Sequence, residues 1–314
     1  MGTGNRSGVV GGALFGGDVP LVREQGALGR RLAIVRTYYR IGSSFPYASD
    51  RQEMAHGSTL LVSLDTVPGR GPSYASIVAG RYDGPIRAFL SQVERAAVRY
   101  RLGAIYICFE HEANAPQHSR LGPPSEFIQA WDHVHQLAAS AHLNWNTGGR
   151  LHWVWILMAE AFRAEPWAAS VGPPSAYWPG KNEVDIVSAD GYNAGDCRQA
   201  RPGSNLVAGG TQVSSPSLLF GGVVAFARAQ GGLPVFIAEW GTVPYTSPEV
   251  QPAYIGQMRS YVTSNHEIAA ALYWNGHGQG NGCNYILDSH PASLSALAFM
   301  GHSAGMQGRV VSAP

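Results

Sequence analysis

The sequence predicts a (β/α)8 barrel, the α/β fold in which eight parallel strands alternate with helices around a closed barrel. Eight short apolar runs are spaced along the 314 residues, and stretches between them show the apolar period of a helix. The alternation takes about 290 residues, close to the roughly 250 residues that such barrels need. We therefore expect one domain over residues 1–314, with the barrel at about residues 8–300.

Each apolar run is rich in β-branched residues, as is typical of strands buried on both faces. The expected strands are residues 9–14, 32–37, 59–64, 104–109, 151–157, 184–189, 234–238 and 269–274. Between the third and fourth runs, residues 85–101 place apolar side chains on one face, and residues 125–142 do the same after the fourth. A doubly wound open sheet is the alternative. The glycines of residues 11–17 lack the G-x-G-x-x-G spacing that its phosphate turn requires.

The charge balance excludes several classes of partner. Lys and Arg number 22 and Asp and Glu number 21, with no basic block, so we expect neither nucleic acid nor an anionic membrane surface as partner. The apolar runs are shorter than the roughly 18 residues of a membrane span. Only 14% of residues are charged, while Tyr (14) and Trp (8) are frequent, which suits a protein that handles neutral sugars. A monomer without a cofactor is expected.

The cysteines and the first residues bear on localisation. Residues 1–18 are rich in glycine and lack the basic region and apolar core of a complete signal peptide. Cys197 and Cys283 follow the sixth and eighth predicted strands and could form one disulfide in an oxidising compartment, leaving Cys108 reduced. Three free thiols are the alternative. We expect a secreted, extracellular protein.

Polar and aromatic residues gather where the predicted strands end, and this is where barrel enzymes carry their chemistry. The residues at these ends are Glu110, His111, Glu112, Asn114, Trp153, Trp155, Asp190, Tyr192, Asn193, Glu239, Trp240, Trp274 and Asn275. A closed barrel brings the ends of the fourth and seventh strands to opposite sides of one mouth. Glu112 and Glu239, 127 residues apart in the chain, can therefore meet.

Two facing carboxyl groups are the equipment for cleaving a glycosidic bond. One must be protonated to assist the leaving oxygen, and the other must be ionised to attack the anomeric carbon or to activate water. Trp and Tyr rings suit the apolar faces of sugar rings. Glu112 is the expected acid/base and Glu239 the expected nucleophile. Glu110 is the rival acid/base, because on an extended strand it would point to the same side as Glu112.

Other interpretations of these residues stay open. His111-Glu112 could be part of a metal site, but no H-E-x-x-H follows and the cysteines lack metal-ligand spacing, so no metal is expected. Asp190 could simply cap the loop after the sixth strand. Trp153 and Trp155 could be core residues.

At these residues the sequence resembles glycoside hydrolase family 26, a retaining family of clan A whose best-known members are β-mannanases. The resemblance covers about residues 80–276 and keeps the order of strands four, six, seven and eight. The matching segments are His111-Glu112-Ala113-Asn114, Trp153-Val154-Trp155, Tyr177-Trp178-Pro179-Gly180, Val184-Asp185-Ile186-Val187, Asp190-Gly191-Tyr192, Glu239-Trp240-Gly241 and Tyr273-Trp274-Asn275.

The resemblance implies a role for each matching residue. Glu112 is the implied acid/base and Glu239 the implied nucleophile, with Tyr192 holding the nucleophile by a hydrogen bond. His111 and Trp274 are implied to line the subsite where cleavage occurs. The further expected substrate contacts are Asn114, Trp155, Trp240 and Asn275.

The sequence also departs from the family near the substrate. Cys108 stands where the family usually has Arg, and Ala113 and Ala115 replace a Met and a Gly. We therefore expect a retaining endo-β-glycanase acting on a β-linked polysaccharide, with β-mannan as the default and other β-glycans open. An inactive barrel that binds carbohydrate is an alternative. A glycanase that trims the producer's own exopolysaccharide is another.

Overall fold

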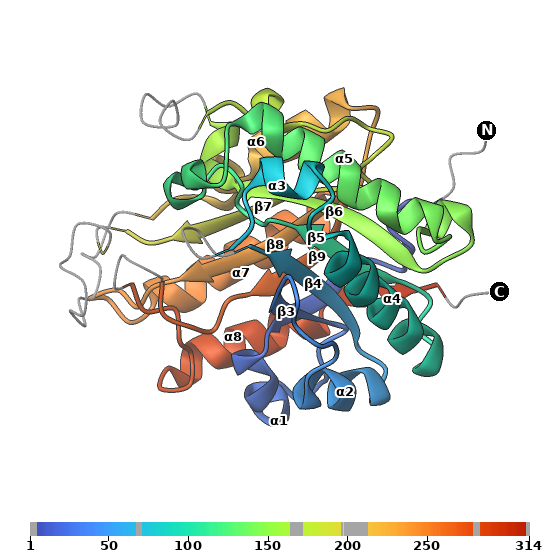
Figure 1. Cartoon of the computed structure of the whole chain (residues 1–314). Helices are drawn as coiled ribbons and strands as arrows, with labels where there is room; N and C mark the ends of the chain where they lie inside the picture. The colour runs from blue at the N-terminus through green and yellow to red at the C-terminus, as the bar shows by residue number, and fades with distance from the viewer. Residues whose placement is uncertain are drawn as a thin grey trace.

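The computed structural model describes residues 5–66, 71–163, 172–195, 197, 213–278 and 283–311. Eight parallel strands close into a barrel in chain order, which confirms the predicted fold class (Figure 1). The barrel strands are β2 (Leu14–Asp18), β3 (Ile34–Arg40), β4 (Thr59–Asp65), β5 (Ile105–Phe109), β6 (Leu151–Met158), β7 (Ile186–Asn193), β8 (Val235–Thr242) and β9 (Ile268–Tyr273).

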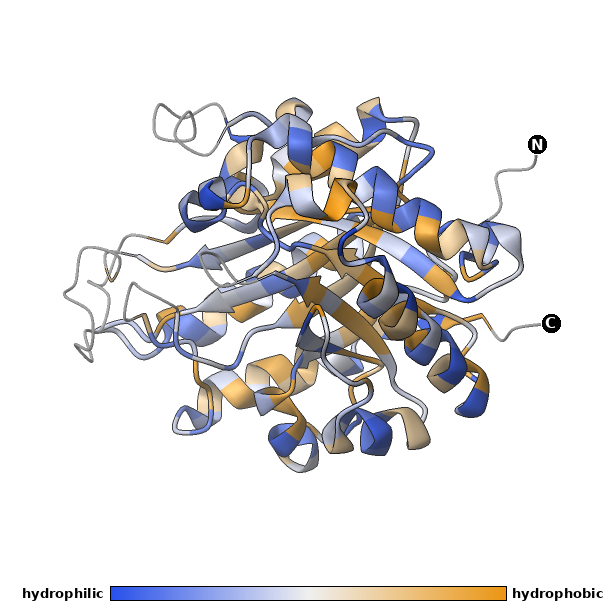
Figure 2. Ribbon diagram, viewed as in Figure 1, coloured by the Kyte–Doolittle hydropathy of each residue, from blue (hydrophilic) through white to orange (hydrophobic). Residues whose placement is uncertain are grey.

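Helices surround the barrel and cover the outer faces of its strands (Figure 1). They are α1 (Gln25–Leu28), α2 (Ala48–Ala55), α3 (Tyr74–Val78), α4 (Asp83–Arg99), α5 (Pro124–Ser140), α6 (Pro216–Ala229), α7 (Val250–Ser264) and α8 (Pro291–His302). α4 and α5 confirm the two helices expected from apolar periodicity. Hydrophobic residues concentrate on the strands and on the inward sides of the helices (Figure 2).

The first barrel strand lies later in the chain than predicted. Residues 9–14 were expected, but the barrel strand is β2, while β1 (Val9–Val10) pairs antiparallel with β10 (Arg309–Val310) outside the barrel. The prediction failed because Gly16 and Gly17 look like strand breakers. A Cβ on Gly16 would lie 2.5 Å from the Ile34 carbonyl oxygen of β3, and one on Gly17 would lie 3.0 Å from the Tyr273 carbonyl oxygen of β9. Glycine is therefore required for β2 to fit between β3 and β9.

Side chains alternate between the two faces of each barrel strand, and this separates two apolar cores. On β3, Ile34 joins the cluster inside the barrel, whereas Val35 joins the larger cluster between strands and helices. The inner cluster comprises Val9, Leu14, Ile34, Leu61, Ala104, Tyr106, Cys108, Val154, Ile156, Ile186, Phe236, Ala238, Ala270 and Leu272. The barrel interior is thus packed, and open space occurs at its two ends.

None of the helices among the described residues is both long and apolar enough to cross a membrane. β1 and β10, which belong to the first and last described segments, pair with each other outside the barrel. There Gly8 accepts a backbone hydrogen bond of 2.7 Å from Val311, next to the β1–β10 pair. The opposite end of the barrel, where the strands terminate, is left to the βα loops.

Candidate active site

A cleft of about 1040 Å³ lies at the carboxyl ends of the barrel strands. Its lining comes from nearly every strand end: Tyr38, Tyr39, Arg40, Ser43, Tyr47, Asp65, Thr66, His111, Glu112, Ala115, Gln117, His118, Met158, Glu160, Asp190, Tyr192, Glu239, Trp274, Gly278 and Tyr285. Glu112 and Glu239 thus face the same cleft. The structure brings His111, Tyr192 and Trp274 to it as well.

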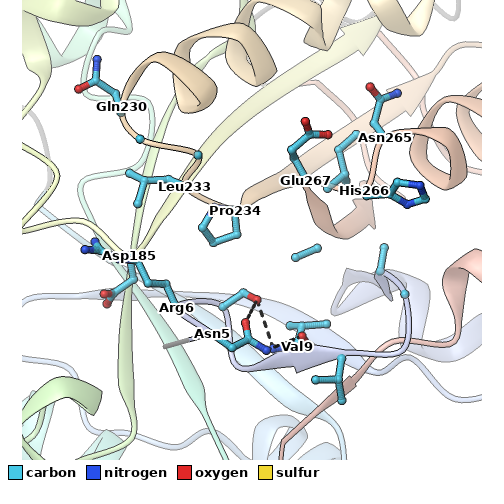
Figure 3. A pocket seen from close by; sticks show the side chains of 18 of the residues that line it. Asn5, Arg6, Val9, Asp185, Gln230, Leu233, Pro234, Asn265, His266 and Glu267 are labelled. Atoms are coloured by element: carbon cyan, nitrogen blue, oxygen red, sulfur yellow. Dashed lines mark hydrogen bonds between the residues drawn. The ribbon is translucent and has the colours of Figure 1, made fainter. Parts of the chain in front are cut away.

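A second cavity, of about 1210 Å³, lies at the amino ends of the strands and is larger (Figure 3). Loops that enter the barrel line it, including Pro234 before β8 and Glu267 before β9. Residues at this end of a barrel usually serve stability. We place the candidate site in the smaller cleft, because the carboxylates expected to do chemistry gather there.

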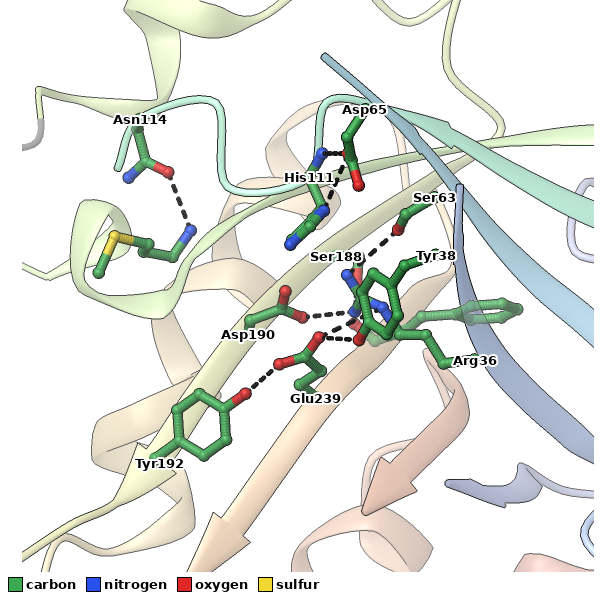
Figure 4. Close-up of polar contacts among 12 residues, drawn as sticks. Arg36, Tyr38, Ser63, Asp65, His111, Asn114, Ser188, Asp190, Tyr192 and Glu239 are labelled. Atoms are coloured by element: carbon green, nitrogen blue, oxygen red, sulfur yellow. Dashed lines mark hydrogen bonds and ion pairs between the residues drawn. The ribbon is translucent and has the colours of Figure 1, made fainter. Parts of the chain in front are cut away.

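The Glu239 carboxylate is held by two hydroxyl donors and one ion pair from two other strands (Figure 4). The Tyr192 hydroxyl donates to Oε2 and the Tyr38 hydroxyl to Oε1, while Arg36 Nε lies 3.3 Å from Oε1. Burial raises the pKa of both tyrosines well above that of free tyrosine, so both stay protonated and able to donate. These contacts hold the carboxylate in a fixed orientation beside a buried positive charge.

Arg36 supplies the positive charge beneath this carboxylate. Its guanidinium is fully buried, lies 2.9 Å from Asp190 Oδ1 and reaches Ser63 Oγ at 3.4 Å. Burial alone would lower the pKa of Arg36, but the Asp190 and Glu239 carboxylates raise it, so the side chain remains charged. Asp190 is therefore the buried partner of Arg36, which answers the question of whether it merely caps a loop.

An irregularity in β8 turns Glu239 towards the cleft. Ile237 and Glu239 pair with consecutive residues of β7, so β8 carries one extra residue at this point. Ala238 belongs to the cluster inside the barrel, and regular alternation would turn Glu239 outward. The bulge instead leaves Glu239 facing the cleft and turns Trp240 outward, 4.8 Å from Tyr273 between ring centroids.

Glu112 lies in the loop after β5, with a left-handed φ of 50°. Its amide donates a 3.0 Å hydrogen bond to Ile156 of β6, which ties the loop to the neighbouring strand. Burial, and then the nearby charge of Glu239, raise the pKa of Glu112 to about 7. A carboxyl group with this pKa carries a proton in mildly acidic solution, as a general acid must.

Glu110, the rival acid/base, is held away from the cleft lining. β5 ends at Phe109, and Glu110 has a φ of 53°, so the two glutamates do not share one extended segment. One carboxylate oxygen of Glu110 accepts a hydrogen bond from the Thr66 amide. Burial, together with the charge of Asp65, raises the pKa of Glu110 to about 8. The expectation that it points the same way as Glu112 is wrong.

His111 is a charged member of the cleft. Its Nδ1 lies 3.0 Å from Asp65 Oδ1, and its amide lies 3.2 Å from the same oxygen. Burial alone would lower the pKa of His111, but the Asp65 carboxylate raises it to about 10. The His111 ring lies 5.3 Å from that of Tyr38, and the Trp274 ring lies 5.9 Å from Tyr38 on an edge-to-face contact.

Two of the expected substrate contacts are tryptophans that lie away from the cleft. Trp155 is fully buried, donates from Nε1 to the carbonyl of Tyr177 at 2.9 Å, and packs edge-to-face on Trp178. It sits on the outer face of β6 and belongs to the core between strands and helices. Trp240 is turned outward by the β8 bulge. Neither indole lines the cleft, so we assign neither to the substrate.

Two expected amide contacts are likewise used inside the protein. Asn114 accepts a 3.0 Å hydrogen bond from the Met158 amide through Oδ1. Asn275 donates to Asp288 at 2.8 Å and accepts from the Leu287 amide at 2.8 Å. Both side chains are buried and neither lines the cleft, so their role is to fix the loops after β5 and β9.

The structure adds Arg36, Tyr38 and Asp65 to the site, and sequence reasoning missed all three. Arg36 and Tyr38 follow Ile34 at two-residue spacing, so they share its face of β3 and point into the barrel. The predicted strand ended at residue 37, one residue too early to include Tyr38. A charged residue inside an apolar strand is the signal that could have revealed Arg36.

Cys197 and Cys283 form a disulfide, with Cα atoms 5.7 Å apart, which settles the alternative left open above. The bridge joins the loop after β7 to the loop after β9. Cys108 is free and buried inside the barrel, as expected for the third cysteine. Both bridged cysteines pack in a cluster with Tyr285, whose ring lies 4.8 Å from that of Tyr192.

Within the described ranges, no group of three or more His, Cys, Asp or Glu side chains is arranged to hold a metal ion. No protein-family model matches the sequence, and no curated protein matches it. Comparison therefore rests on solved structures.

Three solved structures illustrate the likeness. A GH26 β-mannanase from Bacteroides ovatus has a TM-score of 0.62 at 11% identity, covering 94% of this chain and 90% of that one. The GH26 domain of an endo-β-mannanase/endo-β-glucanase from Prevotella bryantii has a TM-score of 0.59 at 10% identity, covering 95% and 91%. A fungal β-1,4-galactanase has a TM-score of 0.58 at 14% identity, covering 93% and 100%. The chain therefore has the (β/α)8 fold of these enzymes.

Proposed function

We propose that the protein is a retaining endo-β-glycanase that hydrolyses a β-linked polysaccharide by double displacement, with Glu239 as nucleophile and Glu112 as acid/base. The observation that carries the proposal is the contrast between two carboxyl groups of one cleft. Glu239 accepts hydrogen bonds from two tyrosine hydroxyls and pairs with the buried Arg36 guanidinium, the surroundings of an attacking carboxylate. Glu112 has a pKa raised to about 7, which favours its protonated form. Such a division of roles is the general requirement of acid-assisted glycoside cleavage.

In the first step, the Glu239 carboxylate attacks the anomeric carbon and forms a glycosyl ester. The bond from that carbon to the glycosidic oxygen breaks, and the proton of Glu112 passes to the departing oxygen. Tyr38, Tyr192 and Arg36 hold the attacking carboxylate in place. Trp274, whose ring is in edge-to-face contact with Tyr38, forms one wall of the space for the sugar.

In the second step, water attacks the same carbon and Glu112 takes its proton. Once Glu239 is esterified it carries no negative charge, so one of the causes that raise the pKa of Glu112 is removed. Glu112 is then ionised and can act as a base. The Glu239–carbon bond breaks, and the product leaves with its original anomeric configuration.

The choice of polysaccharide rests on likeness. The similar structures are named as a β-mannanase, a domain of an endo-β-mannanase/endo-β-glucanase and a β-1,4-galactanase, and β-mannan is our first substrate. The disulfide between Cys197 and Cys283 supports an extracellular setting, because such bonds persist in oxidising compartments.

The proposal is tested by incubating the protein with β-mannan, β-1,4-galactan and mixed-linkage β-glucan. We expect one of them to yield oligosaccharides whose newly released anomers are initially β by proton NMR. Glu239→Gln should abolish the cleavage and Glu112→Gln should slow it by about 10²–10⁴-fold, whereas Glu110→Gln, the matched control, should retain it. Binding without cleavage by the unmodified protein would support the inactive carbohydrate-binding barrel instead. Initial release of the α-anomer would exclude the retaining mechanism.

A further inference from the structure

Tyr47 is an exposed aromatic residue on the rim of the cleft, and neither the fold nor the proposed chemistry explains it. It lies in the loop between β3 and α2, lines the cleft, and is 48% exposed. Isolated exposed aromatics are ordinary on protein surfaces. Tyr47 differs from such isolated residues because contacts with buried residues beneath the surface fix its position.

The ring of Tyr47 stacks face to face on the ring of Tyr39, with centroids 4.2 Å apart and planes 12° apart. Tyr39 is itself buried, and its hydroxyl donates to Asp50 of α2. The Tyr47 amide donates to the Tyr39 hydroxyl at 2.7 Å and lies 3.3 Å from Asp50 Oδ2. Backbone and ring are therefore both anchored, so one face of Tyr47 is covered and the other is left open.

Side chains alternate between the two faces of β3, and this keeps Tyr47 away from the bond that is cleaved. Tyr38 points inward and donates to Glu239, whereas Tyr39, the next residue, points to the opposite face. Because Tyr47 stacks on Tyr39, its ring lies at the outer edge of the cleft. Arg40 and Ser43 line the cleft beside it and offer polar groups for sugar hydroxyls.

The cleft is large enough for more than one sugar. Its volume of about 1040 Å³ is at the upper end of the roughly 300–1,000 Å³ that hold drug-sized ligands. A flat, immobilised ring with one open face matches the apolar face of a pyranose and loses little conformational entropy on binding. Such a ring, away from the bond that is cleaved, can bind another sugar unit of the same polysaccharide.

We propose that Tyr47 is the aromatic platform of an outer subsite, which binds a sugar of a β-linked oligosaccharide away from the residue being cleaved. This inference rests on the proposed function, since it assumes that the cleft takes such a chain. It predicts that Tyr47 contributes to the binding of long oligosaccharides and leaves the binding of short ones unchanged.

The test uses the full-length protein carrying Glu112→Gln, so that ligands are not cleaved. The probes are the β-1,4-linked hexasaccharides and disaccharides of mannose, galactose and glucose, titrated by calorimetry. Adding Tyr47→Ala should weaken the hexasaccharide that binds best by about tenfold, and should leave its disaccharide unchanged. Tyr47→Phe, which keeps the ring, should bind like the parent. Phe299→Ala, which removes an aromatic side chain that is 64% exposed on α8, is the matched surface control and should change nothing.

Three outcomes would overturn the inference. Unchanged hexasaccharide affinity in Tyr47→Ala would refute the platform and leave the proposed function standing. Equal loss for hexasaccharide and disaccharide, at a thermal midpoint of Tyr47→Ala equal to that of the parent, would place Tyr47 in the cleavage subsite and refute an outer platform. Failure of all three hexasaccharides to bind the parent would refute the proposed function together with the platform.

Discussion

Replacing Glu112 with glutamine should remove the alkaline limb of the pH dependence of kcat/KM. In the proposed first step Glu112 must carry a proton. Its pKa is raised to about 7, so the active form is present below pH 7 and is lost as pH rises through that value. Glutamine cannot supply the proton at any pH. The residual kcat/KM of the variant should therefore no longer fall as pH rises through 7.

The magnitude follows from the raised pKa. With a pKa of about 7, roughly 99% of the Glu112 carboxyl is protonated at pH 5, half at pH 7 and about 9% at pH 8. An unshifted glutamate would be only about 0.3% protonated at pH 7. The environment therefore raises the protonated fraction of the Glu112 carboxyl at this pH by roughly 150-fold. Removing a general acid typically costs about 10²–10⁴-fold in rate.

The assay measures kcat/KM between pH 4 and 9 on two substrates of one sugar, the polysaccharide and its 2,4-dinitrophenyl glycoside. The dinitrophenolate leaves without a proton. Glu112→Gln should therefore lose about 10²–10⁴-fold on the polysaccharide and far less in the glycosylation step of the aryl glycoside. The burst of dinitrophenol reports that step directly.

Two results would refute the reasoning. An alkaline limb of the unmodified protein below pH 5.5 would show that the environment does not raise the pKa of Glu112. Equal losses on both substrates would show that Glu112 is not the general acid, and the two roles would have to be reassigned.

Three further predictions concern stability. Burial raises the pKa of Glu110 to about 8, so its contribution to stability is present at low pH and is lost as pH rises towards 8. Ionisation of Glu110 should therefore lower the free energy of unfolding between pH 6.5 and 8, by on the order of 1–2 kcal/mol. Urea denaturation of Glu110→Gln should show a smaller fall over this range, and an equal fall would be contrary evidence. Reducing the bridge between Cys197 and Cys283, 86 residues apart, should cost about 4 kcal/mol, so dithiothreitol should lower the denaturation midpoint of the natural protein and leave Cys197→Ala unaffected. Gly16→Ala should destabilise the barrel by about 1–3 kcal/mol through overpacking against Ile34, while Gly26→Ala, where a Cβ meets nothing within 4 Å, should not; equal midpoints for the two variants would show that β2 can yield.

Much of the fold could be predicted from the sequence because burial on both faces leaves a plain apolar signature in each strand. Seven of the eight predicted strands coincide with barrel strands over most of their length, the first shares only Leu14 with β2, and both predicted helices are present. The exception, β2, contains Gly16 and Gly17, whose use depends on how closely β3 and β9 approach. This is a constraint of tertiary packing, and the pattern of apolar residues along the sequence does not indicate it.

The candidate site was predicted less completely, for two physical reasons. The direction of Trp240 depends on the β8 bulge, and a bulge is one extra residue with no compositional signal. Glu110 and Glu112 point in different directions because both have a left-handed backbone conformation. An extended strand, which the sequence led us to expect at these residues, has no such conformation. By contrast, Trp155 shares the outward face of β6 with Trp153, so the core interpretation left open for both residues is the one that the structure bears out, and the expected substrate contact of Trp155 is not.

The most direct test of the central claim is to trap the covalent intermediate on Glu239. The protein is incubated with 2,4-dinitrophenyl 2-deoxy-2-fluoro-β-glycosides of mannose, glucose and galactose, whose fluorine slows turnover of the glycosyl ester. Peptide mass spectrometry then locates the added sugar. The account predicts one fluoroglycosyl group on Glu239, release of one dinitrophenolate for each group attached, which needs no proton from Glu112, and no label in Glu239→Gln. A label on another carboxylate, or none in a protein that cleaves β-glycan, would contradict the account.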